Sequence, residues 1–157
     1  MKKFVHTATI TLLFASFVTA TQAQNFKDAP VTHLGGSAAI PNSAQFQGAT
    51  HKFEVYVRGK ALSELAIELP KDISIHKGIE ITNQTGKKVE ATASIENRKA
   101  RIVFSQPFPT DTKLSINMQG VTTPGYEGIW LYKIYGKMVG VNGEIPLGTV
   151  RIQTYSG

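Results

Sequence analysis

The chain has 157 residues, no cysteine and a formal net charge of +6. This length suits one compact domain with its own core, and the lack of cysteine excludes disulfides and thiolate zinc sites. The mild basic charge lacks the clustered Lys and Arg of nucleic-acid-binding proteins, so we expect no nucleic-acid partner. The basic charge is compatible with an anionic envelope polymer or a membrane surface as a partner.

Residues 1–23 have the pattern of a secretory signal peptide. Two lysines follow Met1, residues 9–20 are mostly apolar or small, and the small residues Thr21 and Ala23 precede Gln24. The apolar stretch is shorter than the roughly 20 residues that cross a bilayer, and no second one follows, so we expect no membrane span in the mature chain. Cleavage removes both lysines, which takes the net charge from +6 to +4. We expect the mature protein to begin at Gln24 and to act in the periplasm or outside the cell.

The segment 24–50 is rich in Gly, Ala, Ser, Gln and Pro, which predicts an extended arm lying on the domain. From His51 onward apolar and polar residues alternate, as in half-buried strands. A short helical turn is possible near 60–64. The alternating segments are 53–57, 65–69, 73–75, 79–81, 89–95, 100–104 and 114–118.

Two more strands are predicted over 129–139 and 148–155, with Asn142-Gly143 between them as a tight hairpin turn. Eight or nine short strands with turn residues between them predict an all-β fold. We expect an antiparallel β-sandwich, Ig-like with a Greek-key connection, over residues 51–157, and a small barrel is the alternative. The apolar sides of the strands predict a core of Phe53, Val55, Ile67, Ile102, Phe104, Ile116, Trp130 and Ile152.

Several runs of sequence resemble one family of small exported proteins. They are residues 53–70, 78–81, 101–107 and 146–155. The family is the domain of unknown function 2808, found mainly in cyanobacteria, and the resemblance covers about residues 30–155. It implies an exported single β-domain and brings no established substrate, cofactor or catalytic residue.

Three histidines are the candidate metal ligands. His33, His51 and His76 are 18 and 25 residues apart, and no His-x-His pair or Met-rich tract accompanies them. The expected topology also resembles periplasmic copper carriers, which bind copper through a His at the mature N-terminus, whereas this chain would begin at Gln24. We therefore expect no metal or other cofactor, and a copper carrier that uses these histidines is the first alternative.

Sequence motifs for catalysis are missing. The glutamates of the predicted strands fall on their polar sides, and nothing indicates two carboxylates in one buried pocket. The run 35–39 lacks the Gly-x-Ser-x-Gly spacing of a nucleophile elbow. We expect a protein that is not an enzyme, and an enzyme with an unrecognised site is the second alternative.

A candidate binding face lies in the segment 126–137 and the last strand. Alternation places Trp130, Tyr132, Ile134 and Met138 on one side, and the other side together with the last strand gives the predicted partner-binding face: Lys133, Tyr135, Lys137 and Arg151. An aromatic ring between cations can stack on a sugar or bind an anionic polymer. The alternative is that Trp130 fills the core while the lysines protect an edge strand.

These observations predict an exported, non-enzymatic binding or structural module of the cell envelope. Its partner would be an unknown envelope protein or an anionic polymer.

Overall fold

The computed structural model describes residues 30–157, so the expected signal peptide and cleavage site lie outside the described residues. Nine strands and no helix make up this part of the chain, which accordingly has no helix able to cross a membrane. The strands are β1 (His33–Ile40), β2 (Ala49–Val57), β3 (Leu62–Glu68), β4 (Ser74–Asn83), β5 (Ala91–Glu96), β6 (Lys99–Phe108), β7 (Thr112–Thr122), β8 (Gly128–Met138) and β9 (Ile145–Thr154).

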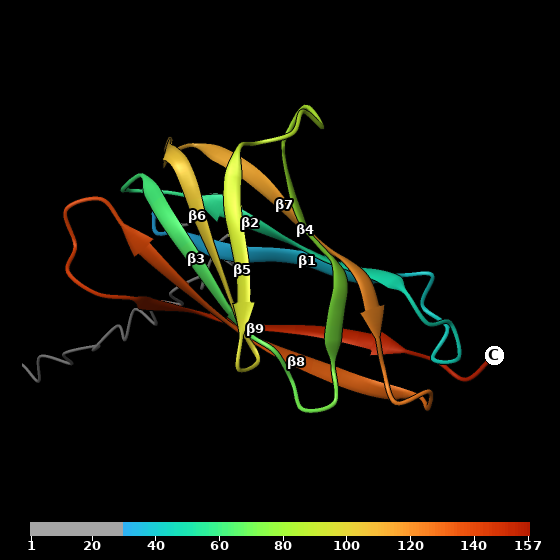
Figure 1. The fold of residues 1–157 in the computed structure, drawn as a ribbon. Helices are drawn as coiled ribbons and strands as arrows, with labels where there is room; N and C mark the ends of the chain where they lie inside the picture. The colour runs from blue at the N-terminus through green and yellow to red at the C-terminus, as the bar shows by residue number, and fades with distance from the viewer. Residues whose placement is uncertain (1–29) are drawn as a thin grey trace, which may run out of the picture.

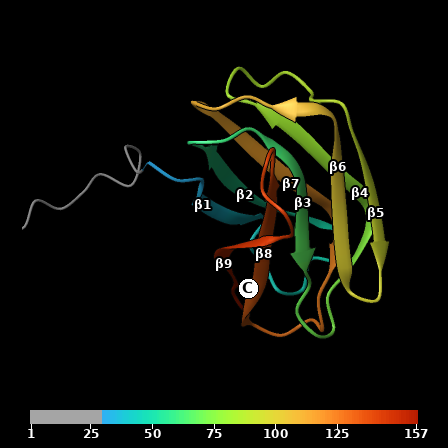
Figure 2. The ribbon, with the colours of Figure 1, turned by 90° about the vertical axis from the view of Figure 1, so that its left-hand side faces the viewer.

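The strands form two antiparallel sheets packed face to face (Figure 1). One sheet has the order β1-β2-β7-β4, and the other has the order β5-β6-β3-β8-β9. Strands β1 and β9 lie side by side, where the Ser37 hydroxyl donates a hydrogen bond of 2.8 Å to the Arg151 carbonyl. Strands β4 and β5 lie on the opposite side of the molecule (Figure 2). The predicted antiparallel β-sandwich is therefore confirmed.

The sandwich begins at His33 rather than at His51. Part of the expected arm is strand β1, which pairs with β2 along its length. Its alternation is hidden in the sequence because the register shifts between Leu34 and Ser37, at two glycines. A Cβ atom on Gly35 would lie 2.6 Å from the ring of Tyr56, so this position tolerates no side chain without a shift of that ring.

Two local predictions were wrong. In place of the helical turn near 60–64, β3 begins at Leu62, and Leu62 and Leu65 are both fully buried because the register of β3 shifts between Leu62 and Glu64. The turn after β8 forms before Asn142: the Val141 amide donates to the Met138 carbonyl at 3.2 Å, and Gly140 has a φ of +77°. The predicted Asn142-Gly143 turn thus lies within a longer loop, residues 139–144.

The core lies between the sheets and contains every residue that the alternation predicted. All eight are buried: Phe53, Val55, Ile67, Ile102, Phe104, Ile116, Trp130 and Ile152. The Trp130 indole donates a hydrogen bond of 3.0 Å to the Thr154 hydroxyl, so its one polar atom is satisfied inside the core.

Truncating Phe104 to Ala should lower the free energy of unfolding by about 3–5 kcal/mol, because it leaves a cavity in a close-packed core. Val103, the next residue along β6, is 40% exposed. Val103→Ala is the matched control and should cost less than about 0.5 kcal/mol. Equal losses in urea denaturation of the two variants would contradict the assigned faces of β6.

Candidate functional site

The predicted binding face lies on the outer side of the five-stranded sheet. Lys133, Lys137 and Arg151 are exposed there and Tyr135 is half-buried. Strand β8 runs between β3 and β9, so that Glu68 lies opposite Lys133 and Glu64 opposite Lys137. Leu131 of β8 lies opposite Arg151.

Carboxylates neutralise part of this face. The Nζ atom of Lys133 lies 3.5 Å from Glu68 and that of Lys137 lies 3.6 Å from Glu64. Glu64 also accepts a hydrogen bond of 2.9 Å from Arg101. The face is therefore an ionic network across β6, β3 and β8 rather than the free cationic stripe that alternation alone indicated.

The loop after β8 joins the same network. Glu144 lies 3.0 Å from the Lys99 ammonium and 3.5 Å from the Arg101 guanidinium. The Lys99 ammonium also lies 5.5 Å from the centre of the Tyr135 ring, within cation-π range. Within residues 30–157 the Arg151 guanidinium pairs with no carboxylate and donates a hydrogen bond of 3.4 Å to the Gln153 side chain. Cations outnumber carboxylates on this face.

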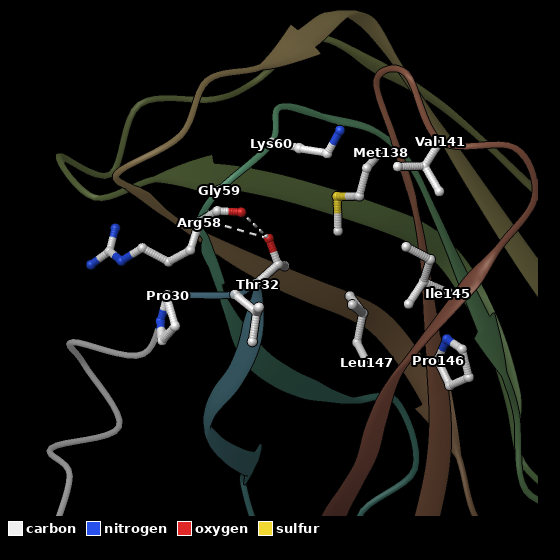
Figure 3. Close-up of a pocket in the computed structure, with 11 residues that line it drawn as sticks. Pro30, Thr32, Arg58, Gly59, Lys60, Met138, Val141, Ile145, Pro146 and Leu147 are labelled. Atoms are coloured by element: carbon white, nitrogen blue, oxygen red, sulfur yellow. Dashed lines mark hydrogen bonds between the residues drawn. The ribbon is translucent and has the colours of Figure 1, made fainter.

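An apolar pocket of about 440 Å³ opens at one end of the sandwich, beside this network (Figure 3). Three segments far apart in the sequence line it: residues 30–32, residues 58–60 and residues between Met138 and Leu147. Met138, Val141, Ile145 and Leu147 surround the opening, whereas the guanidinium of Arg58 points away from them (Figure 3).

Two polar residues at the pocket, Thr32 and Arg58, are hydrogen bonded to each other. The Thr32 hydroxyl donates to the Arg58 carbonyl at 3.1 Å and accepts from the Arg58 amide at 3.0 Å. Arg58 also forms an ion pair of 3.4 Å with Asp111. No carboxylate or imidazole lines this pocket, although Lys60 does, so the lining suits an apolar group better than acid-base chemistry.

The three histidines have separate environments. His33 is hydrogen bonded through Nδ1 to the Val31 carbonyl at 2.9 Å, and His76 to the Thr122 hydroxyl at 3.3 Å. His51 is fully buried in the core. Within residues 30–157 no three His, Cys, Asp or Glu side chains form a group that could hold a metal ion.

His51 and Tyr132 form a buried polar contact between the two sheets. The Nδ1 atom of His51 and the Tyr132 hydroxyl are 2.7 Å apart, and the Nε2 atom has no partner. Burial lowers the pKa of His51 to about 4 and raises the pKa of Tyr132, because each charged form loses its hydration. Both groups are neutral at physiological pH, and neither lies in the pocket.

One carboxylate has a shifted pKa. Partial burial raises the pKa of Glu54, but the hydrogen bond of 2.9 Å from Lys113 and its charge outweigh burial and leave the pKa below its usual value. Glu54 lies opposite Ser115, on the outer side of the four-stranded sheet. A single paired carboxylate there is typical of a structural ion pair rather than of acid-base chemistry.

The sequence matches a protein family over most of its length. A model of the family described as protein of unknown function DUF2808 matches residues 26–153. The chain belongs to this family. No curated protein matches the DUF2808 chain significantly.

Solved structures share the fold at low sequence identity. The major pilin SpaD of Corynebacterium diphtheriae has a TM-score of 0.58 and 13% identity, over 79% of this DUF2808 chain and 34% of the pilin. The N-terminal domain of the Streptococcus gordonii adhesin Sgo0707 has a TM-score of 0.54 and 11% identity, over 80% of this chain and 32% of the adhesin structure. BslA, a bacterial hydrophobin, has a TM-score of 0.53 and 10% identity, over 81% of this chain and 95% of BslA. The chain thus spans about a third of the pilin and of the adhesin structure, and these similarities establish the fold alone.

The buried His51 predicts a specific pH dependence of stability. Its folded pKa, about 4, lies below the ordinary value of 6.5, so the unfolded chain binds the proton first as the pH falls. Stability from this group is complete above pH 6.5 and is lost between pH 6.5 and 4, by about 3 kcal/mol in total.

The pH dependence of urea denaturation checks this expectation. The double variant His51→Leu/Tyr132→Phe removes both polar partners. Its free energy of unfolding should therefore fall by about 3 kcal/mol less than that of the wild type between pH 6.5 and 4. His76→Gln, at an exposed histidine, is the control and should keep the wild-type slope. An unchanged slope in the double variant would contradict a neutral His51.

Proposed function

We propose that this protein is an exported, non-enzymatic module of the cell envelope that binds a partner. The binding region would be the outer face of the five-stranded sheet together with the adjacent apolar pocket. The observation that carries the proposal is the pocket itself: it is open, its volume of about 440 Å³ lies in the range of ligand sites, and its lining is mostly apolar, with no carboxylate or imidazole. Such a pocket suits recognition rather than catalysis.

The pocket and the outer face form one continuous region. Pro146 and Leu147 at the start of β9 line the pocket, while Glu144, in the loop just before β9, forms ion pairs with Lys99 and Arg101 on the face. A partner that places an apolar group in the pocket would therefore also meet Tyr135 and the surrounding charges. The excess of cations favours an anionic partner, an envelope protein or a polymer.

The fold and the sequence pattern at the N-terminus support this role. The sandwich is shared with a pilin and an adhesin domain, which are surface proteins. The signal-peptide pattern of residues 1–23 directs the chain out of the cytoplasm. A binding or structural role in the envelope, in the periplasm or at the cell surface, is consistent with both.

Export has its own test. Protein recovered from the periplasm or the medium should begin at Gln24, because signal peptidase cleaves after small residues such as Ala23. N-terminal sequencing measures this. Mature material that still carries Met1 would contradict export by this route.

Binding is tested by two charge substitutions and measured as retention on envelope fractions of the host. Ile145→Glu places a carboxylate in the apolar pocket, which a bound apolar group would strip of water. Retention should fall at least tenfold, because desolvating the charge raises the free energy of binding by more than the ~1.4 kcal/mol that corresponds to a tenfold loss of affinity. Arg151→Glu removes a cation that has no carboxylate partner within residues 30–157, so it should slow association and reduce the salt dependence of retention.

Both variants have controls elsewhere on the molecule. Ile129→Glu changes a similarly exposed isoleucine at the other end of β8, and Lys52→Glu changes an exposed lysine on the other sheet. The controls should bind like the wild type, and all four variants should keep the wild-type melting temperature within a few degrees. Equal retention of Ile145→Glu and Ile129→Glu would overturn the pocket as the binding site.

A further inference from the structure

The two open sheets have four edge strands, β1, β4, β5 and β9, and three of them are protected. Strands β1 and β9 lie against each other. Strand β4 is interrupted by a register shift between Ile75 and Gly78, and the residues after its turn pair back to it, with the Val89 amide donating to the Ile81 carbonyl at 2.9 Å. Bulges and covered edges prevent pairing with another chain.

Strand β5 has none of these protections. Among the strand pairs of residues 30–157, β5 and β6 form the one pair without a register shift, so the edge is regular. Its sequence, Ala-Thr-Ala-Ser-Ile-Glu, contains no Pro and no Lys, and its residues from Thr92 onward are exposed. Ile95 is 39% exposed although its partner in β6, Ala100, is fully buried.

The hairpin that joins β5 to β6 indicates which backbone groups face outward. Asn97 and Arg98, with φ of 48° and 59°, form a two-residue turn, so Glu96 and Lys99 beside it are a hydrogen-bonded pair. Along an antiparallel ladder, hydrogen-bonded pairs alternate with pairs that are not hydrogen bonded. Counting back from Glu96 in steps of two makes Glu90 a hydrogen-bonded position, and the Ser105 amide does donate to the Glu90 carbonyl, at 3.2 Å. The amides and carbonyls of Ala91, Ala93 and Ile95 therefore point to the open edge.

We propose that β5 is a homodimerisation edge, where β5 of a second copy of this chain adds antiparallel and extends the five-stranded sheet across both molecules. The two-fold axis would pass at Ser94, which then lies opposite Ser94 of the second copy. In this register Ala93 lies opposite Ile95, and Thr92 lies opposite Glu96. The outward amides and carbonyls of Ala93 and Ile95 gain partners in both copies.

Charge and burial favour a second copy in this register. Glu90 comes opposite Arg98, and no two like charges face each other, whereas an axis at Ala93 would place Glu90 opposite Glu96. The exposed side chain of Ile95 is covered by Ala93 of the other copy, and each such cross-strand pair contributes about 0.2–1 kcal/mol. Because a six-residue edge is a small interface, the dimer is weak and depends on concentration.

The first experiment measures the sedimentation coefficient of the mature protein over a concentration series. The wild type should shift from monomer to dimer. Ala93→Pro removes only an outward amide and should stay monomeric with a melting temperature near that of the wild type. Ser94→Pro removes an amide that bonds to β6 and should instead unfold at lower temperature. A wild type that is monomeric throughout, or an Ala93→Pro variant that still dimerises, overturns the proposal.

The second experiment tests the register by disulfide crosslinking. Because the chain has no cysteine, an introduced cysteine can pair only with the same cysteine of a second copy. Ser94 is a non-hydrogen-bonded position across the interface, where facing Cα atoms lie about 4.5 Å apart and a disulfide fits. Ser94→Cys should therefore form a covalent dimer on mild oxidation, at least tenfold faster than the control Thr92→Cys. Equal rates for the two variants, or crosslinking of Ser94→Cys that Ala93→Pro does not slow, would refute the register.

Discussion

Burial of the apolar sides of the two sheets against each other is the interaction on which this domain depends. The chain has no cysteine, and residues 30–157 show no group able to hold a metal, so packing and hydrogen bonds carry its stability. Strands β2 and β7 on one side and β3 and β8 on the other supply most of the fully buried side chains. The outer faces of the sheets take no part in this packing. The ionic network and the β5 edge lie on or beside these outer faces.

The alternation of apolar residues was enough to predict the core and the fold class. Side chains such as Phe53 and Ile116 could be assigned to the interior because a half-buried strand has a strict period of two. The same rule failed where the backbone departs from that period. Strand β1 was missed at Gly35 and Gly36, and the start of β3 was missed at the register shift between Leu62 and Glu64.

The candidate site was only partly predictable. Alternation correctly placed Lys133, Tyr135, Lys137 and Arg151 on the outer side, but it does not tell which strands are neighbours. The ion pairs with Glu64 and Glu68 follow from the position of β3 beside β8, a pairing between segments far apart in the chain. The pocket has the same origin, since its three lining segments meet only in the folded domain.

The loop between β8 and β9 joins two parts of the surface that differ in chemistry. Glu144 anchors it to Lys99 and Arg101, and the next three residues, 145–147, form a wall of the pocket. The two contacts are thermodynamically linked for a ligand that binds only when the loop is anchored, because such a ligand favours the anchored loop and is in turn favoured by it. An uncharged ligand of the pocket would therefore bind less tightly as ionic strength rises, although it carries no charge to be screened. Its binding would also slow amide hydrogen exchange in β6, a strand that it never touches.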